Sequence, residues 1–308
     1  MNKTTIILFF FSIISVYGQT DNWKIYNNFN SSLPNTKVTS TVLDNEGNMF
    51  FGTHNGIVIH DGNSWKVFNK KNSSLPSNKI LSISVDNFNN KWIGTTNGLI
   101  IHSGINFKLI NTKNSKLPSN KIRQILIKKG KKYIATDKGL VILTLNDTIV
   151  INKNFFNIPD ENIISLELGN KENIWIGTNS GIIKYNEGEM KFLNKENSIL
   201  PDNHIWCIKK ENETIWVGTK KGLVRITDLY SEVFTKKNSP LPSDIITSIT
   251  IDDYNKIFNG TEYNEESVLA YSKYWIEAQK RINIDKGKFG LFKTHNARLK
   301  INNNYYTD

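Results

Sequence analysis

The prolines of this 308-residue chain recur at one kind of place. Six of the seven follow a leucine or an isoleucine, and the seventh, Pro240, lies beside the last of these. The six are Pro34, Pro76, Pro118, Pro159, Pro201 and Pro242, at successive spacings of 42, 42, 41, 42 and 41 residues. A fixed period of this length is typical of proteins in which one supersecondary unit is copied along the chain.

Two further markers keep the same phase. A segment such as residues 65–68 (WKVF) begins 11 residues before a proline. A Gly-Thr or Ala-Thr pair follows each proline at a nearly constant distance, at residues 52–53, 94–95, 135–136, 177–178, 218–219 and 260–261. Three markers held in phase over six copies indicate an internal repeat of about 42 residues.

Each repeat predicts four short strands. Residues 80–85 alternate and are β-branched, which indicates a first strand, and a polar turn follows. The segment around Trp92 indicates a second strand, residues 98–102 a third, and segments like 65–68 a fourth. The turn between the second and third strands ends in Gly56, Gly98, Gly139, Gly181 or Gly222, where we expect a positive φ.

No window before residue 265 shows a sustained helical period. Four strands per repeat of about 42 residues predict an all-β fold, a β-propeller of four-stranded blades. Six blades is the simplest count, and seven blades or an incomplete ring are the alternatives.

Residues 75–80 (LPSNKI), Asp86 and residues 92–99 (WIGTTNGL) resemble the two-component regulator propeller repeat found in bacterial sensors, many of them from Bacteroidetes. The resemblance covers residues 23 to about 262. It implies the periplasmic sensing part of hybrid histidine kinases, many of which respond to glycans. The sequence shows no kinase, receiver or transmembrane segment, so we expect only the binding role to carry over.

The ends of the repeat region predict how the ring closes. Residues 23–27 look like a fourth strand without a blade of its own, and residues 246–261 supply the first and second strands of a sixth blade. Pairing the termini would remove the open sheet edges. Residues 268–271 could supply the third strand, and in a competing arrangement Trp275 belongs to the outer strand. We assign the propeller to residues 19–278 and a basic tail without repeat markers to residues 279–308.

The N-terminus resembles a signal peptide. Lys3 precedes an apolar run over residues 6–14, and Val16-Tyr17-Gly18 resembles a signal-peptidase site. The run is shorter than the about 20 residues needed to span a bilayer. We therefore predict a signal peptide over residues 1–18, cleavage after Gly18, and a periplasmic or secreted protein without a membrane span. Its single cysteine, Cys207, excludes an intramolecular disulfide.

The net charge of +11 raises the question of an anionic partner. The lysines are spread over loops rather than gathered in one dense run, so we predict no nucleic-acid partner. The sequence also indicates no cofactor, and we expect a monomer.

Ligand-binding residues are predicted in two sets of connections. In a propeller the fourth-to-first and second-to-third connections emerge on one face. Their residues vary between repeats while the scaffold does not, as recognition of an asymmetric ligand would require, although solvated turns are also free to vary. The predicted binding residues are Lys37, Lys79, Lys121 and His204 around the channel mouth, with His54 and Lys220 outside them.

Other candidate residues fit the scaffold better than chemistry. His60 and His102 are equivalent residues of neighbouring repeats, but the matching positions offer no further metal ligands, so no metal site is predicted. Cys207 occupies a position on the innermost strand that mostly holds serine, and no catalytic partner is evident. The tryptophans Trp92, Trp175 and Trp216 are interpreted as core between blades.

The sequence contains no phosphate loop, zinc-protease helix or Gly-x-Ser-x-Gly elbow, so no enzyme is predicted. The leading functional hypothesis is an exported, sensor-type propeller that binds a small molecule or a glycan. An alternative is a scaffold that contacts another envelope protein, motivated by lysine-bearing connections such as residues 69–72. A lyase or hydrolase with a site of scattered loop residues is the weaker alternative.

Overall fold

The computed structural model describes residues 26, 29, 31–34, 37–104, 106–170, 173–186, 188–251, 257–261, 299–301 and 304–306. The predicted signal peptide (1–18), residues 268–271, Trp275 and most of the tail (279–308) lie outside the described residues. So do all of residues 23–27 except Tyr26.

Five four-stranded sheets follow one another along the chain. Blade 1 contains β1 (Val38–Leu43), β2 (Met49–Thr53), β3 (Gly56–His60) and β4 (Trp65–Phe68). Blade 2 contains β5 (Ile80–Val85), β6 (Lys91–Thr95), β7 (Gly98–Ser103) and β8 (Asn106–Ile110). Blade 3 contains β9 (Ile122–Lys128), β10 (Lys131–Thr136), β11 (Gly139–Leu143) and β12 (Thr148–Ile151). Blade 4 contains β13 (Ser165–Leu168), β14 (Ile174–Thr178), β15 (Gly181–Asn186) and β16 (Glu189–Leu193). Blade 5 contains β17 (Ile205–Glu211), β18 (Thr214–Thr219), β19 (Gly222–Ile226) and β20 (Ser231–Phe234).

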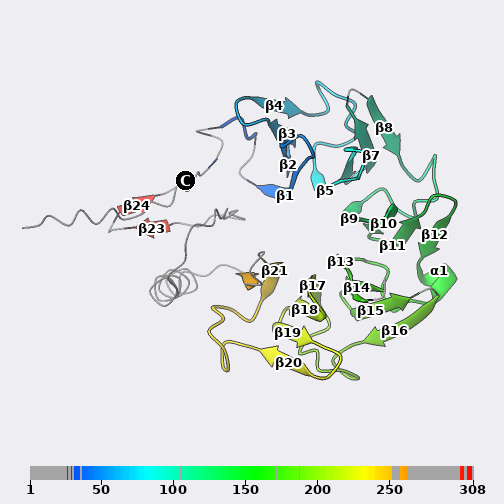
Figure 1. Ribbon diagram of the computed structural model, residues 1–308, viewed down its shortest axis with the longest axis vertical. Helices are drawn as coiled ribbons and strands as arrows, with labels where there is room; N and C mark the ends of the chain where they lie inside the picture. Colours follow the sequence, from blue (N-terminus) through cyan, green and yellow to red (C-terminus); the bar gives the residue numbers. More distant parts are fainter. Residues whose placement is uncertain are drawn as a thin grey trace, which may run out of the picture.

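The sheets are arranged around a central axis as the blades of a propeller (Figure 1). The strands of each sheet pair antiparallel in chain order, and the first strands of successive blades lie against one another around the axis. A sixth sheet pairs β21 (Ile246–Ile251) with β22 (Ile257–Thr261) and supplies the first two strands of a further blade. The predicted all-β propeller with blades of about 42 residues is therefore confirmed.

Two short elements do not follow from the repeat pattern. The connection between blades 3 and 4 contains a single helical turn, α1 (Lys153–Phe156), where no helix was predicted. Asn152 caps it, because its side-chain oxygen accepts from the backbone N–H groups of Asn154 and Phe155. One turn is too short to give a helical period.

Within the predicted tail, β23 (Leu299–Ile301) pairs with β24 (Asn304–Tyr306). Among the described residues no helix is long and apolar enough to cross a membrane.

The Thr-x-x-Gly turn between the second and third strands has the same geometry in blades 1 to 5. The threonine Oγ1 donates to the glycine carbonyl and accepts from the backbone N–H two residues on, as in Thr95, Asn97 and Gly98. The glycines have φ between +118° and +143°, which confirms the predicted positive φ. A Cβ at Gly98 would lie 2.9 Å from the Ile110 carbonyl oxygen, so the outer strand also requires glycine there.

In blades 1, 2, 4 and 5 the residue that precedes this threonine is a second glycine, which packs against the next blade, and blade 3 has Ala135 there. A Cβ at Gly52 would lie 2.8 Å from the Ile80 side chain, at the start of the next blade. The same close approach joins Gly94 to Ile122. The tryptophans Trp92, Trp175 and Trp216 are only 7%, 6% and 6% exposed, so their predicted place in the core between blades is confirmed.

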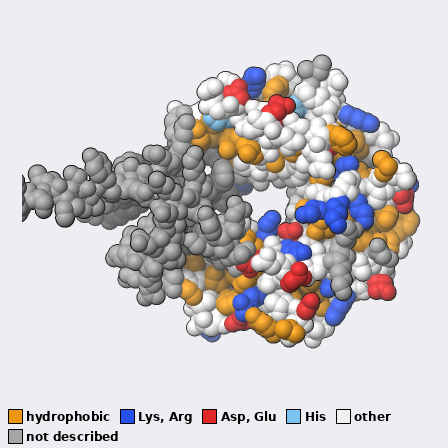
Figure 2. Space-filling view, in the orientation of Figure 1, with side chains coloured by type: hydrophobic (Ala, Val, Ile, Leu, Met, Phe, Trp, Pro, Cys, Tyr) orange, Lys and Arg blue, Asp and Glu red, His pale blue; other side chains and the backbone are white. Residues whose placement is uncertain are grey.

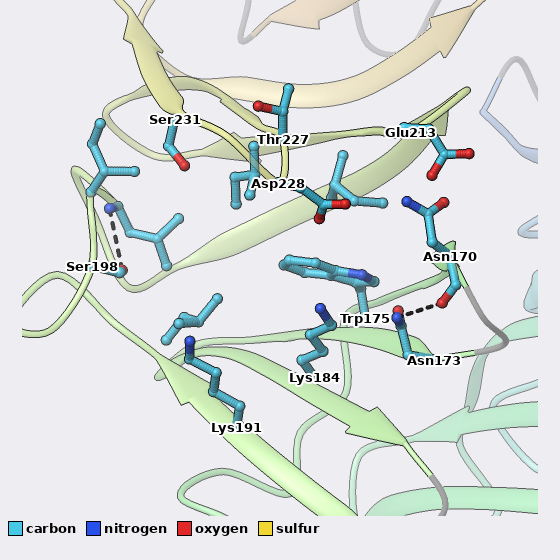
Figure 3. A pocket seen from close by; sticks show the side chains of 15 residues that line it. Asn170, Asn173, Trp175, Lys184, Lys191, Ser198, Glu213, Thr227, Asp228 and Ser231 are labelled. Atoms are coloured by element: carbon cyan, nitrogen blue, oxygen red, sulfur yellow. Dashed lines mark hydrogen bonds between the residues drawn. The ribbon is translucent and has the colours of Figure 1, made fainter.

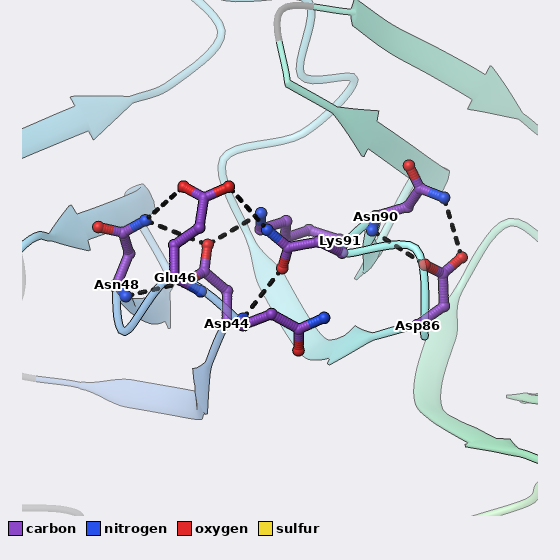
Figure 4. Close-up of polar contacts among 8 residues, drawn as sticks. Asp44, Glu46, Asn48, Asp86, Asn90 and Lys91 are labelled. Carbon is purple, nitrogen blue, oxygen red and sulfur yellow. Dashed lines mark hydrogen bonds and ion pairs between the residues drawn. The ribbon is translucent and has the colours of Figure 1, made fainter.

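Blade 1 lacks the hydrogen bond that anchors the tryptophan of blade 2. In blade 2 the Asp86 carboxylate accepts from the Trp92 indole N–H at 2.9 Å. Blade 1 has Phe50 in place of the tryptophan, and Phe50 has no N–H to donate. The equivalent carboxylate of Asp44 is instead paired with Lys91 Nζ of blade 2 at 2.9 Å (Figure 4).

This ion pair is buried, with 1% of the Asp44 side chain and 8% of the Lys91 side chain exposed. Burial of the Asp44 carboxyl opposes its ionisation. The hydrogen bonds from Lys91, Asn48 and Glu46 outweigh that effect, and the pKa of Asp44 lies below its ordinary value. The pair therefore joins blade 1 to blade 2 as a buried contact specific to this interface.

Replacing Lys91 with methionine should destabilise the protein by about 3 kcal/mol, because the buried Asp44 carboxylate loses its counter-charge. The free energy of unfolding from urea titration is the measurement. Lys209→Met is the matched control, since Lys209 pairs with Glu167 at 3.5 Å but is 48% exposed, and it should cost less than about 1 kcal/mol. Equal losses in the two variants would contradict the assigned role of the Asp44–Lys91 pair.

Tyr26 bears on the predicted closure of the ring. It packs on blade 1 against Leu33, Phe51 and Val58, and its ring meets that of Trp65 edge-on at 5.1 Å. Phe68, which follows Tyr26 by one repeat, packs on blade 2 in the corresponding cluster. Tyr26 thus makes the contact that the outer strand of a preceding blade makes, as the predicted closure requires of this residue.

Deleting residues 19–30 should lower the thermal midpoint and promote aggregation, because the blade 1 contact is lost and a strand edge is exposed. Tyr26→Ala should reproduce part of this loss, about 2 kcal/mol, without shortening the chain. Scanning calorimetry of both variants is the measurement, and deletion of residues 280–308 is the comparison that should cost less. If the N-terminal deletion melts like the intact protein while the C-terminal one collapses, the closure scheme is wrong.

Candidate functional site

The two predicted sets of connections lie at the same end of the ring, which we call the upper face. In blade 1 the Asn55 side chain, in the β2–β3 turn, donates to the Pro34 carbonyl in the connection before β1. In blade 2 the backbone N–H of Thr96 donates to the Lys79 carbonyl at 3.3 Å. Each turn is therefore held beside the connection that leads into its own blade.

All six predicted binding residues belong to these connections. Lys37, Lys79, Lys121 and His204 directly precede β1, β5, β9 and β17, and His54 and Lys220 lie in the β2–β3 and β18–β19 turns. The structure brings His204 and Lys220 close enough to interact, since the charge of Lys220 acts on the imidazole. The other four are distributed over blades 1 to 3, and their role in binding stays a prediction.

His204 is the most constrained of the six. Its ring meets that of Trp206 edge-on at 4.4 Å, and its Nε2 is buried without a hydrogen-bond partner among the described residues. Burial of the ring lowers the pKa of His204 below its ordinary value, and Lys220 lowers it further, against the opposing carboxylates of Asp202 and Asp160. The imidazole is therefore neutral at pH 7.

Three other buried polar atoms, in blade 3 or in the connection to blade 4, lack a partner within the described part of the chain: Arg123 Nε, Asp137 Oδ1 and Asn162 Oδ1. The Ile163 N–H donates to the Thr136 carbonyl, which places the turn of Asp137 beside Asn162. The Asn162 N–H in turn donates to Asp160, whose charge reaches His204. Asp137, Asn162 and His204 therefore form one strip from blade 3 to blade 5. Arg123 lies in β9 of blade 3.

Trp206 completes this strip with an aromatic side chain that is 38% exposed at the start of β17. We call Arg123, Asp137, Asn162, His204 and Trp206 the blade 3–5 cluster. A buried polar atom without a partner costs about 1 to 3 kcal/mol, so these four atoms require a partner such as ordered water or a bound ligand.

Sequence reasoning identified His204 but missed Arg123 and Trp206. Both lie five residues after a repeat proline, at a position occupied by Thr39, Leu81, Arg123, Ile164, Trp206 and Thr247. This position varies as much as the connections do, and it begins the innermost strand. Comparing the repeats at that position would have found both residues.

The other candidates serve packing. His60 stacks on Trp65 with ring centroids 4.2 Å apart, and His102 lies 4.4 Å from Phe107. In the described residues no three His, Cys, Asp or Glu side chains converge as metal ligands. The Cys207 thiol donates to the Ile246 carbonyl across the blade interface, and burial raises its pKa to about 12, so it is a poor nucleophile at neutral pH.

Basic side chains are concentrated in blade 3. Figure 2 shows the ring hollowed at its centre and Lys and Arg side chains gathered over β9 and β10. The hairpin between these strands carries Lys128, Lys129, Lys131 and Lys132. It connects a first to a second strand and so lies at the end opposite the upper face.

Comparisons with known proteins agree with the architecture. Residues 32–55 match the family model described as two component regulator propeller, and no curated protein sequence matches the chain. The extracellular domain of BT3049 from B. thetaiotaomicron, assigned to a hybrid two component system, is 24% identical with a TM-score of 0.65 over 77% of this chain and 33% of that chain.

Two other solved structures share the fold. PorZ, a bacterial surface component of the type-IX secretion system of Porphyromonas gingivalis, is 17% identical with a TM-score of 0.56 over 73% of this chain and 37% of that chain. Virginiamycin B lyase from Staphylococcus aureus is 14% identical with a TM-score of 0.56 over 75% and 86%. This chain spans about a third of the BT3049 domain. At residues 32–55 the chain carries a two-component regulator propeller repeat, and its fold is the β-propeller that these proteins share.

Proposed function

We propose that this chain is an exported, sensor-type propeller that binds a hydroxyl-rich ligand, a glycan or a small sugar, on its upper face over the blade 3–5 cluster. The observation that carries this proposal is the set of buried, unpartnered polar atoms in the blade 3–5 cluster, together with the exposed ring of Trp206 beside His204. The N-terminal sequence and the fold shared with extracellular domains support export.

The polar groups of the cluster match the chemistry of hydroxyl groups. Asp137 Oδ1 and Asn162 Oδ1 can only accept, Arg123 Nε can only donate, and His204 Nε2 does either according to its tautomer. A sugar hydroxyl donates and accepts at once, so neighbouring hydroxyls can satisfy all four atoms. The apolar face of a sugar ring can pack on Trp206, since aromatic rings offer a flat and weakly hydrated surface.

Trp206→Ala should weaken binding of the recognised glycan by at least about tenfold, the loss of roughly 1.4 kcal/mol of contact energy. A glycan array on the intact protein would identify the ligand, and calorimetric titration would measure the change. Leu81→Ala is the matched control, because Leu81 holds the same repeat position in blade 2, outside the cluster. Unchanged affinity in Trp206→Ala would remove the cluster from the binding site.

Acidification should destabilise the protein through His204. Its pKa in the folded state is lower than the about 6.5 of an unfolded chain, so the unfolded state binds more protons between the two values. The contribution is fully present above about pH 6.5 and is lost as the pH falls from there through the folded-state pKa.

Urea midpoints measured from pH 7.5 to 5 should therefore decline, and His204→Gln should make the decline shallower. His102, whose pKa burial and Lys91 also lower, should account for a further part of the decline. An identical pH dependence in His204→Gln would contradict the burial assigned to this imidazole.

A protein partner is the second candidate function. The connections after the fourth strands carry exposed lysines such as Lys70 and Lys71, and the fold is shared with PorZ, a bacterial surface component. Pull-down from an envelope extract distinguishes the two functions: capture of one protein by a chain that binds no glycan favours the scaffold. Conversion of the identified ligand, rather than its simple binding, would favour the lyase or hydrolase hypothesis.

A further inference from the structure

A second cavity lies between blades 4 and 5, separate from the blade 3–5 cluster. Its volume is about 480 Å³, within the usual range for a site that holds one small molecule. Its polar lining includes Asn170, Asn173, Lys184, Lys191 and Glu213, around the edge of Trp175 (Figure 3).

The repeat pattern is altered beside this cavity. Gly169 precedes Trp175 by six residues, as Asp86 precedes Trp92 in blade 2. Asp86 accepts from the indole N–H of Trp92, but glycine has no side chain to do so. The indole N–H of Trp175 has no hydrogen-bond partner among the described residues. Blade 4 thus lacks the carboxylate that anchors the tryptophan in blade 2.

One end of the pocket is rich in unpaired acceptors. Asn173 is 9% exposed, and its Oδ1 is buried without a partner, as is the Oδ1 of Asn170. Figure 3 draws Glu213 at this same end, and its carboxylate makes no ion pair within the described part of the chain. A group that donates several hydrogen bonds and carries a positive charge would satisfy this end.

A second polar element of the lining, which also includes Asp228, is a pair of like charges. Lys184 of β15 is the direct cross-strand partner of Lys191 of β16, and like charges placed in this way destabilise a sheet. In blade 5 the same cross-strand position holds Arg225 and Glu232, which form an ion pair at 2.7 Å. Neither lysine of blade 4 has a carboxylate partner among the described residues, so an anionic group would relieve their repulsion.

We propose that this pocket binds a small zwitterion, an amino acid or a short peptide with free termini. The ammonium group would donate to Asn170, Asn173 and Glu213, and the carboxylate would pair with Lys184 and Lys191. Aliphatic side chains that complete the lining, Leu193, Ile199, Leu200, Ile215 and Ile226, would contact an apolar side chain of the ligand. This site is independent of the glycan site proposed above.

Calorimetric titration of the intact protein with L-leucine, L-leucyl-L-alanine and their N-acetylated and C-amidated forms tests the proposal. The expected result is saturable binding of one of the free forms, weakened at least about tenfold by capping either end. Equal binding of capped and free forms, binding of mono- or disaccharides at this pocket instead, or no saturable binding of any free form would overturn it.

Lys191→Glu is the decisive variant, because it recreates the opposite-charge pair of blade 5 and should not impair folding. It should raise or maintain the thermal midpoint while reducing affinity for the free forms at least about tenfold. Lys195→Glu makes the same charge change on an exposed residue that does not line the pocket, and it should leave the affinity unchanged. Equal affinities in the two variants would contradict the carboxylate site.

Trp206→Ala should leave binding of the free forms intact, which distinguishes this pocket from the proposed glycan site on the upper face.

Discussion

The ring depends on the close approach of each second strand to the first strand of the following blade. Gly52, Gly94, Gly177 and Gly218 lie so near Ile80, Ile122, Ile205 and Ile246 that no Cβ fits between them. The isoleucines are fully buried at these contacts. Because dispersion and apolar burial fall off steeply with separation, this approach sets how tightly the blades pack. It also explains why a glycine stands in the middle of a strand, where it is otherwise unfavourable.

Polar side chains near the axis add hydrogen bonds between neighbouring blades. The Ser40 hydroxyl accepts from the Ile83 N–H of the next blade, and Ser165 accepts in the same way from Ile208. In blade 3 Gln124 occupies this position and both donates to and accepts from Leu166. The serine-rich position thus joins neighbouring innermost strands, and Cys207 stands in it as a structural residue.

Departures from the repeat are the most informative features of this chain. Phe50 replaces the tryptophan of blade 1, so no indole N–H is present. The Asp44 carboxylate pairs with Lys91 of the neighbouring blade instead. In blade 4 Gly169 takes the place of a carboxylate instead, and Trp175 lines a cavity in which buried acceptors lack partners. The first departure is compensated within the protein and the second is not. In a repeat protein, binding sites can therefore be sought where one repeat differs from the others and no other residue of the protein replaces the lost interaction.

The sequence by itself determined the all-β propeller, its period, the four strands of each blade, the positive φ of the turn glycines and the burial of Trp92, Trp175 and Trp216. These features follow from local residue patterns that recur in each repeat, so that every repeat gives an independent indication of the same strand or turn. The sequence also placed His204 and Lys220 in connections at one end of the ring. The single-turn helix α1 was not predicted because one turn is too short to show a helical period.

Only the tertiary structure decided which residues of different blades meet. The pairing of Asp44 with Lys91, the strip that joins Asp137 to His204, and the pocket beside Trp175 each combine residues from separate copies. Periodicity specifies the environment of a position within its own blade. It does not specify which side chain stands opposite in the next blade, because that depends on inter-blade distance, rotamer and burial, which arise only when the blades pack.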